Sequence, residues 1–566
     1  MGWLTSIRGL GARADRGRVL MLAAVVLLAA VGGGALLLRA SAPVVPSEAL
    51  SAPRFVDVTE AAGVEHAFRG ADEFAGGGVA ALDCDADGRP ELYLAGGTAP
   101  AALFHNDSPV GGDLRFSRIA DPATDITGVT GAYPVDVDGD EVLDLGVLRR
   151  GENVLLRGLG DCRFERANEK WSFDGDGEQA EWTTAFSATW EGSAALPTLA
   201  FGNYRDGAST DPADLCFDNV LVRPDSSGAG YAAPVPLLPS WCALSVLFSD
   251  WDRSGRRDLR VTNDKHYFLP GIGEDQLWRI APGEPPRLYT RDEGWAHVEI
   301  NGMGIASRDL TGDGYPEVFL SNQADNKLQT LDQGPERPAY RDLAIRRAAT
   351  AGFPYTGPDT SLPSTAWHAQ FDDVNNDGYS DLFVAKGNVE SDPGYAAMDP
   401  SNLLIGLADG TFEEGAMDAG IVSFDRGRGA ALVDLDLDGL VDLVEVFRDV
   451  NVKVWRNAGS GDAGAPRPMG HWLGLRPHQS GSNPDAIGAW IEVKAGGRET
   501  QLELTVGGGH VSGQLGWVHV GLGPADRAEV RVQWPDGTVG PWRGVEADGL
   551  YVLERGGDEA LSWSPS

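Results

Sequence analysis

A short acidic pattern recurs six times along this chain, beginning at residues 83, 136, 250, 309, 373 and 434. Each copy places an oxygen-bearing side chain at its first, third, fifth and ninth positions, and five copies have glycine at the sixth position. Glycine permits the sharp turn that gathers such side chains around one point, and calcium prefers oxygen ligands of this kind. Each copy therefore predicts a calcium loop.

The predicted calcium ligands occupy the same four positions in every copy. They are Asp83, Asp85, Asp87, Glu91, Asp136, Asp138, Asp140, Asp144, Asp250, Asp252, Ser254, Asp258, Asp309, Thr311, Asp313, Glu317, Asp373, Asn375, Asp377, Asp381, Asp434, Asp436, Asp438 and Asp442. The second copy has Glu141 at the sixth position in place of glycine, which weakens the prediction of an ion there.

The last copy also fits the EF-hand pattern, because Glu445 stands at its twelfth position. Its flanks, residues 429–433 and 443–447, are short and largely apolar and show no helical period, so they predict strands. The other five copies have leucine or valine at the twelfth position. We therefore interpret each copy as a connection between two strands, with Glu445 outside the ligand set.

The spacing of the copies predicts the architecture. Successive copies begin 53 to 64 residues apart, except for one interval of 114 between residues 136 and 250. That interval has room for a further unit without the acids, which we place at residues 185–203. Units of about 60 residues with four short strands each are typical of β-propeller blades. The sequence thus predicts an all-β fold, a seven-bladed β-propeller over residues 55–458.

The order of strands within the units predicts how the ring closes. The last unit ends with the strand at residues 452–455 and has no fourth strand before the glycine- and proline-rich linker at 459–468. An unassigned strand, residues 55–59, precedes the first unit. We expect this N-terminal strand to complete the last blade.

A second, smaller β-domain is predicted over residues 469–556, followed by a tail at 557–566. Alternating stretches at 490–494, 501–506 and 528–534 indicate strands, and the domain contains no acidic loop. Its glycine-rich segment, residues 507–512, is either a ligand-binding loop or a turn that lets backbone approach backbone closely.

The N-terminus predicts export. Residues 1–18 hold four arginines and one acid, and residues 19–38 carry no charge. Such a run spans a bilayer with its basic flank in the cytoplasm. It is either a transmembrane anchor or a signal peptide cleaved after the A-x-A at 40–42. Residues 39–54 form a linker, and the protein is expected in the cell envelope or secreted.

Cysteine usage agrees with an oxidising compartment. Cys84, Cys162, Cys216 and Cys242 allow three pairings, between which the sequence does not choose. Our working assignment is Cys84 with Cys162 and Cys216 with Cys242.

The net charge of −37 argues against nucleic acid as a partner, because phosphate binding requires clustered lysine and arginine. No nucleophile elbow, zinc-protease motif or P-loop is present. We therefore favour a binding, adhesion or scaffold module with a protein or glycan ligand. The alternative is a carbohydrate-active lyase or hydrolase with its site at the central opening of the propeller.

The acidic loops with their flanks resemble the FG-GAP/VCBS repeats of integrin-type propellers, and residues 55–64 resemble the cartilage acidic protein group. Residues 486–493, 506–512, 518–523 and 532–537 resemble the UnbV/ASPIC domain that follows such propellers. The resemblance implies a calcium-binding extracytoplasmic propeller connected with adhesion. The chain departs from it in the unit at 185–203, which lacks the loop, and at Glu141.

Overall fold

Strands make up nearly all the regular structure of this protein. The computed structural model describes residues 50–70, 74–173, 182–205, 215–264, 271–389 and 392–565. Within these ranges the helical elements are the short α3 (Ala416–Ala419) and the 3-10 turn η2 (Arg291–Glu293). The predicted helix at 19–38 lies outside the described residues, and no helix in the described ranges is long and apolar enough to cross a membrane.

Nine sheets are formed by the described residues, and six of them contain four consecutive strands in spatial order. The first three are β2 (Val79–Leu82), β3 (Glu91–Leu94), β4 (Ala102–Asn106) and β5 (Phe116–Ile119); β6 (Val129–Val135), β7 (Asp144–Arg149), β8 (Val154–Gly158) and β9 (Phe164–Arg166); and β10 (Thr183–Thr189), β11 (Thr198–Asn203), β12 (Val220–Val222) and β13 (Val235–Pro236).

The next three repeat the same antiparallel order. They are β14 (Ala243–Ser249), β15 (Asp258–Asn263), β16 (Gln276–Arg279) and β17 (Arg287–Leu288); β18 (Gly302–Arg308), β19 (Glu317–Asn322), β20 (Lys327–Leu331) and β21 (Tyr340–Asp342); and β22 (Ala366–Asp372), β23 (Asp381–Lys386), β24 (Asn402–Gly406) and β25 (Phe412–Glu414).

The seventh sheet joins the two ends of the repeat region. It consists of β26 (Gly427–Val433), β27 (Asp442–Phe447), β28 (Lys453–Asn457) and β1 (Phe55–Asp57). Strand β1 pairs antiparallel with β28, with Phe55 opposite Asn457 and Asp57 opposite Trp455. The predicted completion of the last unit by the N-terminal strand is therefore confirmed.

The first strands of the seven sheets contact one another in sequence order, from β2 through β6, β10, β14, β18 and β22 to β26, which contacts β2 again. These contacts form a closed ring. Strands β6, β10 and β14 are buried at every position, because neighbouring sheets cover both of their faces. The unit predicted at 185–203 is confirmed as the hairpin of β10 and β11.

The tail folds as two further four-stranded sheets around its own core, which includes Leu475, Ile491, Val530 and Trp534. One sheet has β33 (Val518–Gly523), β29 (His471–His478), β36 (Gly549–Glu554) and β37 (Leu561–Trp563), and the other has β31 (Arg498–Glu503), β30 (Trp490–Ala495), β34 (Arg527–Gln533) and β35 (Arg543–Glu546).

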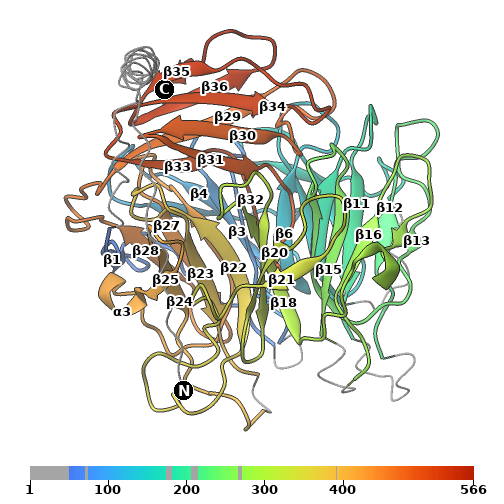
Figure 1. The fold of residues 1–566 in the computed structure, drawn as a ribbon, viewed down its shortest axis with the longest axis horizontal. Helices are drawn as coiled ribbons and strands as arrows, with labels where there is room; N and C mark the ends of the chain where they lie inside the picture. Colours follow the sequence, from blue (N-terminus) through green and yellow to red (C-terminus); the bar gives the residue numbers. More distant parts are fainter. Residues whose placement is uncertain are drawn as a thin grey trace, which may run out of the picture. The chain divides into compact units, whose positions relative to one another are not determined.

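One strand of the tail joins the ring instead of the tail sheets. Strand β32 (Gly513–Leu515) pairs in parallel with β2, and in Figure 1 it lies among the strands of the ring, below the orange and red strands of the tail. The predicted strand at 501–506 ends earlier, at Glu503. The residues after Glu503 leave the tail to enter the ring.

Both disulfides of the working assignment are present. Cys84 pairs with Cys162, and Cys216 pairs with Cys242. The first bond ties the loop after β2 to the turn between β8 and β9, so it links two neighbouring sheets of the ring. The second links the approach to β12 with the start of β14, again across neighbouring sheets.

Ring closure through β1 predicts a large effect of one substitution. Phe55 is 4% exposed and packs with Leu443 and Trp455. Phe55→Ala is expected to lower the free energy of unfolding by about 3–4 kcal/mol, from lost burial and the cavity left behind. The neighbouring Arg54→Ala, which removes an exposed pair with Asp462, is expected to cost about 1 kcal/mol or less. Urea midpoints followed by tryptophan fluorescence measure both, and equal effects would contradict closure by β1.

Candidate metal loops and the tail interface

The six acidic segments, residues 83–91, 136–144, 250–258, 309–317, 373–381 and 434–442, connect the first and second strands of six ring sheets. We call them the connector loops. Their sixth residues all have a left-handed backbone, at Gly88, Glu141, Gly255, Gly314, Gly378 and Gly439. In every loop the N–H of this residue donates to a carboxylate oxygen of the first residue, over 2.6–3.0 Å. The six loops thus share one turn geometry.

The second loop departs from the others in sequence and not in conformation. Glu141 has a φ of 67°, in the same left-handed region as the 82°–89° of the glycines at this position. Its N–H donates to Asp136 over 2.9 Å, as the glycine N–H groups do in the other loops. The doubt that the sequence raised about this loop therefore does not extend to its backbone.

The acid at the ninth position has a structural task. Both oxygens of Asp442 accept backbone N–H groups, one from Leu435 within the loop and one from Asn457 at the end of β28. Asp144 makes the same two bonds with Val137 and Gly158. This buried carboxylate ties each loop to the third strand of its sheet, which explains why an acid recurs there.

Three of the connector loops bring carboxylates together closely enough to hold an ion. The groups are Asp83, Asp85 and Asp87; Asp136, Asp138 and Asp144; and Asp434, Asp436 and Asp442, with the ligand atoms of each group within 4.8 Å of one another. Asp85 and Glu91 also meet His105, which the sequence interpretation left out. Among the described residues, no such group forms in the loops at 250, 309 and 373, where a serine, threonine or asparagine replaces one acid.

Several buried oxygens in these loops have no partner. Oδ1 of Asp138, of Asp250 and of Asp436 is buried without a hydrogen bond. A buried carboxylate oxygen costs free energy unless it is paired with a donor or a cation. The donor set, oxygen atoms only, is the set that calcium prefers, so the residues present fit this ion.

Neighbouring cations neutralise the other oxygens. Arg456, from β28, donates to Asp436 Oδ2 over 2.5 Å, and Arg157, from β8, donates to Asp138 Oδ2 over 2.8 Å. Each arginine leaves the Oδ1 atom of its aspartate unpartnered. An ion at Oδ1 is therefore compatible with both pairs.

The electrostatics of the last loop favour a bound cation. Burial raises the pKa of Asp436 to about 8, with the Asp438 carboxylate as a further cause. Burial and the neighbouring carboxylates also raise the pKa of Asp434 and of Asp442. Without a cation, these groups are driven to hold protons near neutral pH.

Glu445 lies away from the last loop. It is buried in the middle of β27, and its Oε1 accepts a hydrogen bond from Ser401 Oγ over 2.6 Å. The structure therefore agrees with its exclusion from the ligand set.

In the ring sheet without a connector loop, an ion pair occupies the equivalent place. Thr198 stands at the ninth position and donates to Glu191 Oε1 over 2.7 Å. Arg223, after β12, donates to both oxygens of Glu191, over 2.6 and 3.0 Å. The guanidinium thus links loop and third strand where the other sheets use a carboxylate.

The connector loops also contact the tail domain. Arg253 donates to Gln533 Oε1 over 2.6 Å and lies 4.1 Å from the centre of the Trp490 ring. The N–H of Asp250 donates to Glu503 over 2.7 Å. A Cβ atom added at Gly439 would stand 1.9 Å from the Trp472 ring, so this position requires glycine for close approach as well as for its φ of 82°.

A segment of the tail, residues 504–517, enters the middle of the ring; we call it the insert. Its Gly508 and Gly509 donate N–H groups to Val246 of β14 and Ile305 of β18, over 2.8 and 2.6 Å. Its Val511 carbonyl oxygen would lie 1.8 Å from a Cβ atom at Gly78. Of the two interpretations of the glycine-rich run at 507–512, a ligand-binding loop or close approach of backbone to backbone, the structure therefore agrees with the second.

Two family models match parts of the chain. Residues 373–445 match the model described as FG-GAP-like repeat, and residues 479–560 match the model described as ASPIC and UnbV. The chain carries an FG-GAP-like repeat followed by an ASPIC and UnbV domain. The repeat begins at one connector loop and ends just after another, and the ASPIC and UnbV domain contains the insert. No curated protein matches the chain.

Three solved structures resemble the chain at low identity. BBS1N, solved in complex with ARL6DN and soaked with mercury, is 10% identical with a TM-score of 0.41, over 72% of this chain and 98% of that one. Sqt1 of Saccharomyces cerevisiae is 11% identical with a TM-score of 0.38, over 81% and 99%. An Agrocybe aegerita protein that recognises non-reducing terminal N-acetylglucosamine is 15% identical with a TM-score of 0.38, over 65% and 86%.

The shared turn geometry predicts opposite effects of two substitutions. Glu141→Gly is expected to raise the free energy of unfolding by about 0.5–1 kcal/mol, because a left-handed backbone is strained for every residue but glycine. Gly255→Ala is expected to lower it by about 1 kcal/mol, since a Cβ there meets no atom within 4 Å and only the backbone strain is added. Thermal unfolding with calcium present measures both. A destabilised Glu141→Gly variant would show that the glutamate side chain itself stabilises the loop.

Proposed function

We propose that this protein is an extracytoplasmic, calcium-binding seven-bladed β-propeller that acts as a binding or scaffold module. The observation that carries the proposal is the convergence of carboxylates in three connector loops, with buried oxygens left unpartnered. Loops of this set also approach the tail domain closely, as at Gly139 beside Ser482 and at Gly439 beside Trp472. Calcium would thus hold the loops in the form on which that domain rests.

The stabilisation expected from calcium is large. An ion that binds with a Kd near 10⁻⁴ M at about 1 mM free calcium contributes about 1.4 kcal/mol, so six independent sites would contribute roughly 8 kcal/mol. That sum is comparable to the net stability of an ordinary domain. The role proposed for all six sets of ligands is therefore structural.

Export and attachment to the membrane belong to the same proposal. Two disulfides link neighbouring ring sheets, and such bonds persist in oxidising compartments. An FG-GAP-like repeat agrees with an extracellular setting. The segment at 19–38 would serve as anchor or as cleaved signal, and the ligand would be a protein or a glycan of the envelope or its surroundings.

The carbohydrate-active alternative requires an accessible site at the central opening of the ring. The insert occupies that opening next to the tail domain, where Gly508 and Gly509 bond to β14 and β18. This occupation favours the binding or scaffold module over the enzyme.

Calcium stoichiometry tests the proposal. Asp436→Asn is expected to reduce the number of ions bound per chain by one in calorimetric titration, because it weakens a group of three carboxylates. It should also reduce the rise in melting temperature that calcium causes.

The matched control is Glu191→Gln, in the ring sheet without a connector loop. This variant is expected to lower the melting temperature equally with and without calcium. An unchanged melting temperature of the wild-type protein after calcium removal would refute structural ions.

The effect of calcium is also expected to depend on pH. Because the pKa of Asp436 is raised to about 8 in the folded protein, the metal-free folded state keeps protons that the unfolded chain, with a pKa of about 3.9, has released. The metal-free protein therefore loses stability as the pH rises from about 4 towards 8. Calcium replaces these protons. The difference in melting temperature between calcium-loaded and resin-stripped protein should grow from pH 5 to pH 8, and a constant difference would contradict this linkage.

A further inference from the structure

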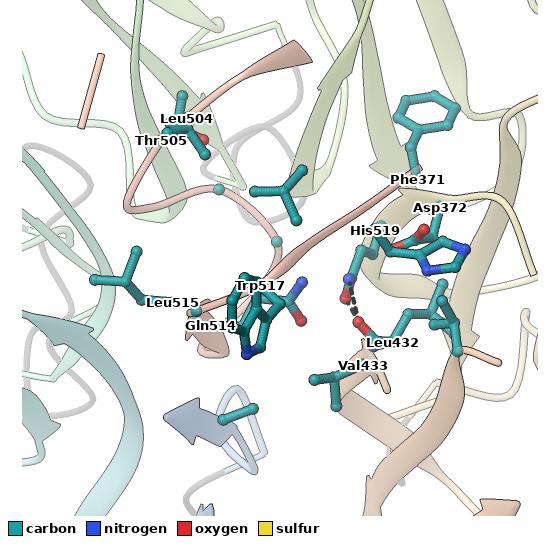
Figure 2. Close-up of a pocket in the computed structure, with 18 of the residues that line it drawn as sticks. Phe371, Asp372, Leu432, Val433, Leu504, Thr505, Gln514, Leu515, Trp517 and His519 are labelled. Atoms are coloured by element: carbon teal, nitrogen blue, oxygen red, sulfur yellow. Dashed lines mark hydrogen bonds between the residues drawn. The ribbon is translucent and has the colours of Figure 1, made fainter. Parts of the chain in front are cut away.

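A cavity of about 250 Å³ lies between the ring and the tail domain. The insert leaves part of the space beside it unfilled, although it pairs with β2 through β32 and bonds to β14 and β18. The cavity walls come mainly from β18, β22 and β26 and from residues of the tail domain. Figure 2 shows the space between Trp517 and Gln514 of the insert and Leu432 and Val433 of β26.

Most of the cavity wall is apolar. Leu432 and Val433 of β26, Leu515 and Trp517 of the insert and Leu550 of β36 all line it. Leu515 and Trp517 are only half-buried although they belong to a segment inside the ring. Their remaining apolar surface faces the cavity, where a ligand would cover it.

Flat aromatic surfaces bound part of the wall. The rings of Trp472 and His519 are stacked at an interplanar angle of 17°, and both residues line the cavity. Trp517 lies beside Trp563 with ring centroids 5.1 Å apart. Such surfaces pack best against planar rings.

Two opposite charges stand together at one side of the cavity. Arg308, at the end of β18, donates from Nη2 to the carbonyl of Phe371 over 2.9 Å, and Asp372 is the next residue of β22. Asp372 accepts one bond, from the N–H of Asp373 over 2.8 Å. A cationic group entering here is attracted by Asp372 but repelled by Arg308, and an anionic group is attracted by Arg308 but repelled by Asp372. A neutral group that both donates and accepts hydrogen bonds satisfies both side chains.

Unpartnered polar atoms mark the same cavity. His368, which is 4% exposed and lines the cavity, accepts the N–H of His510 at Nδ1 over 3.1 Å. Its Nε2 is buried and has no hydrogen-bond partner. Ser307 Oγ and Trp517 Nε1, of residues that also line the cavity, are likewise buried without partners. Native proteins rarely leave such groups unpaired, so their gathering at one cavity indicates a missing ligand.

We propose that this cavity binds a small neutral molecule with a planar apolar body and an amide- or phenol-type head group that meets Arg308 and Asp372. The inference goes beyond the proposed function, whose ligand is a protein or a glycan, because it adds a separate site for a small molecule. Its size sets a scale: a cavity of about 150 Å³ holds benzene, so about 250 Å³ accommodates two fused rings.

Four naphthalene compounds test the proposal on the full chain, with calcium present throughout. They share one apolar body and differ in the head group: naphthalene-2-carboxamide, 2-naphthoate, 2-naphthylmethylammonium and unsubstituted naphthalene. Calorimetry and saturation-transfer NMR measure their affinities. The carboxamide is expected to bind at least about tenfold more tightly than the anion or the cation. Each charged compound brings its head group close to a side chain of like charge in a partly buried site, which weakens its binding.

Two variants test the assignment of the head-group site. Asp372→Asn removes the negative charge and is expected to strengthen 2-naphthoate binding about tenfold, while Arg308→Gln is expected to do the same for the ammonium compound. Asp526→Asn, an exposed position of the tail, is the control and should leave all affinities unchanged.

Two results would overturn the proposal: no saturable binding of any compound up to 1 mM, or an order of affinities in the wild-type protein that does not favour the carboxamide. Both are measured on the calcium-loaded protein. They are therefore distinct from a failure of calcium to stabilise the fold, which the melting experiments detect separately.

Discussion

The bond from the sixth N–H of each connector loop to its first carboxylate is the interaction on which much of this structure depends. It recurs in all six loops and fixes a tight turn between the first two strands of a sheet. The ninth carboxylate then ties that turn to the third strand, as Asp442 does through Leu435 and Asn457. The acids at the first and ninth positions therefore stabilise the loops even without an ion. The carboxylate oxygens that make no hydrogen bond remain available to bind a cation.

The same turns form the surface on which the tail domain rests. Because Gly439 has no side chain, Trp472 can approach its backbone, and Arg253 reaches Gln533 from the fourth position of its loop. Anything that reshapes the loops consequently reshapes the interface. The tail in turn sends the insert into the ring, where glycine on both sides allows backbone to meet backbone. Ring, loops and tail thus depend on one another in their stability.

The repeat of the acids was sufficient to predict the ring sheets, the unit without acids and the closure by β1, because each follows from spacing and strand order. The pairing of the cysteines agrees with the working assignment, although spacing alone could not select it. The set of ligands that converge was only partly predictable. Loops with four acids, such as 434–442, bring three together, whereas 373–381, with Asn375, does not. Only one feature of the sequence, the glycine run at 507–509, could have indicated that residues 504–517 enter the ring. The same run is equally typical of a ligand-binding loop.

The cavity had no signal in the sequence, for a physical reason. Its walls come mainly from strands β18, β22 and β26 and from tail residues between Trp472 and Leu550, and no local pattern links Arg308 to Asp372 or either to Trp517. Arg308 and Asp372 meet because β18 and β22 are neighbours in the ring, and Trp517 reaches them because the insert passes through the ring beside β2, β14 and β18. Side chains from distant parts of the chain therefore line one cavity. The polar atoms left without partners there, Nε2 of His368 among them, are the ones that a ligand would satisfy.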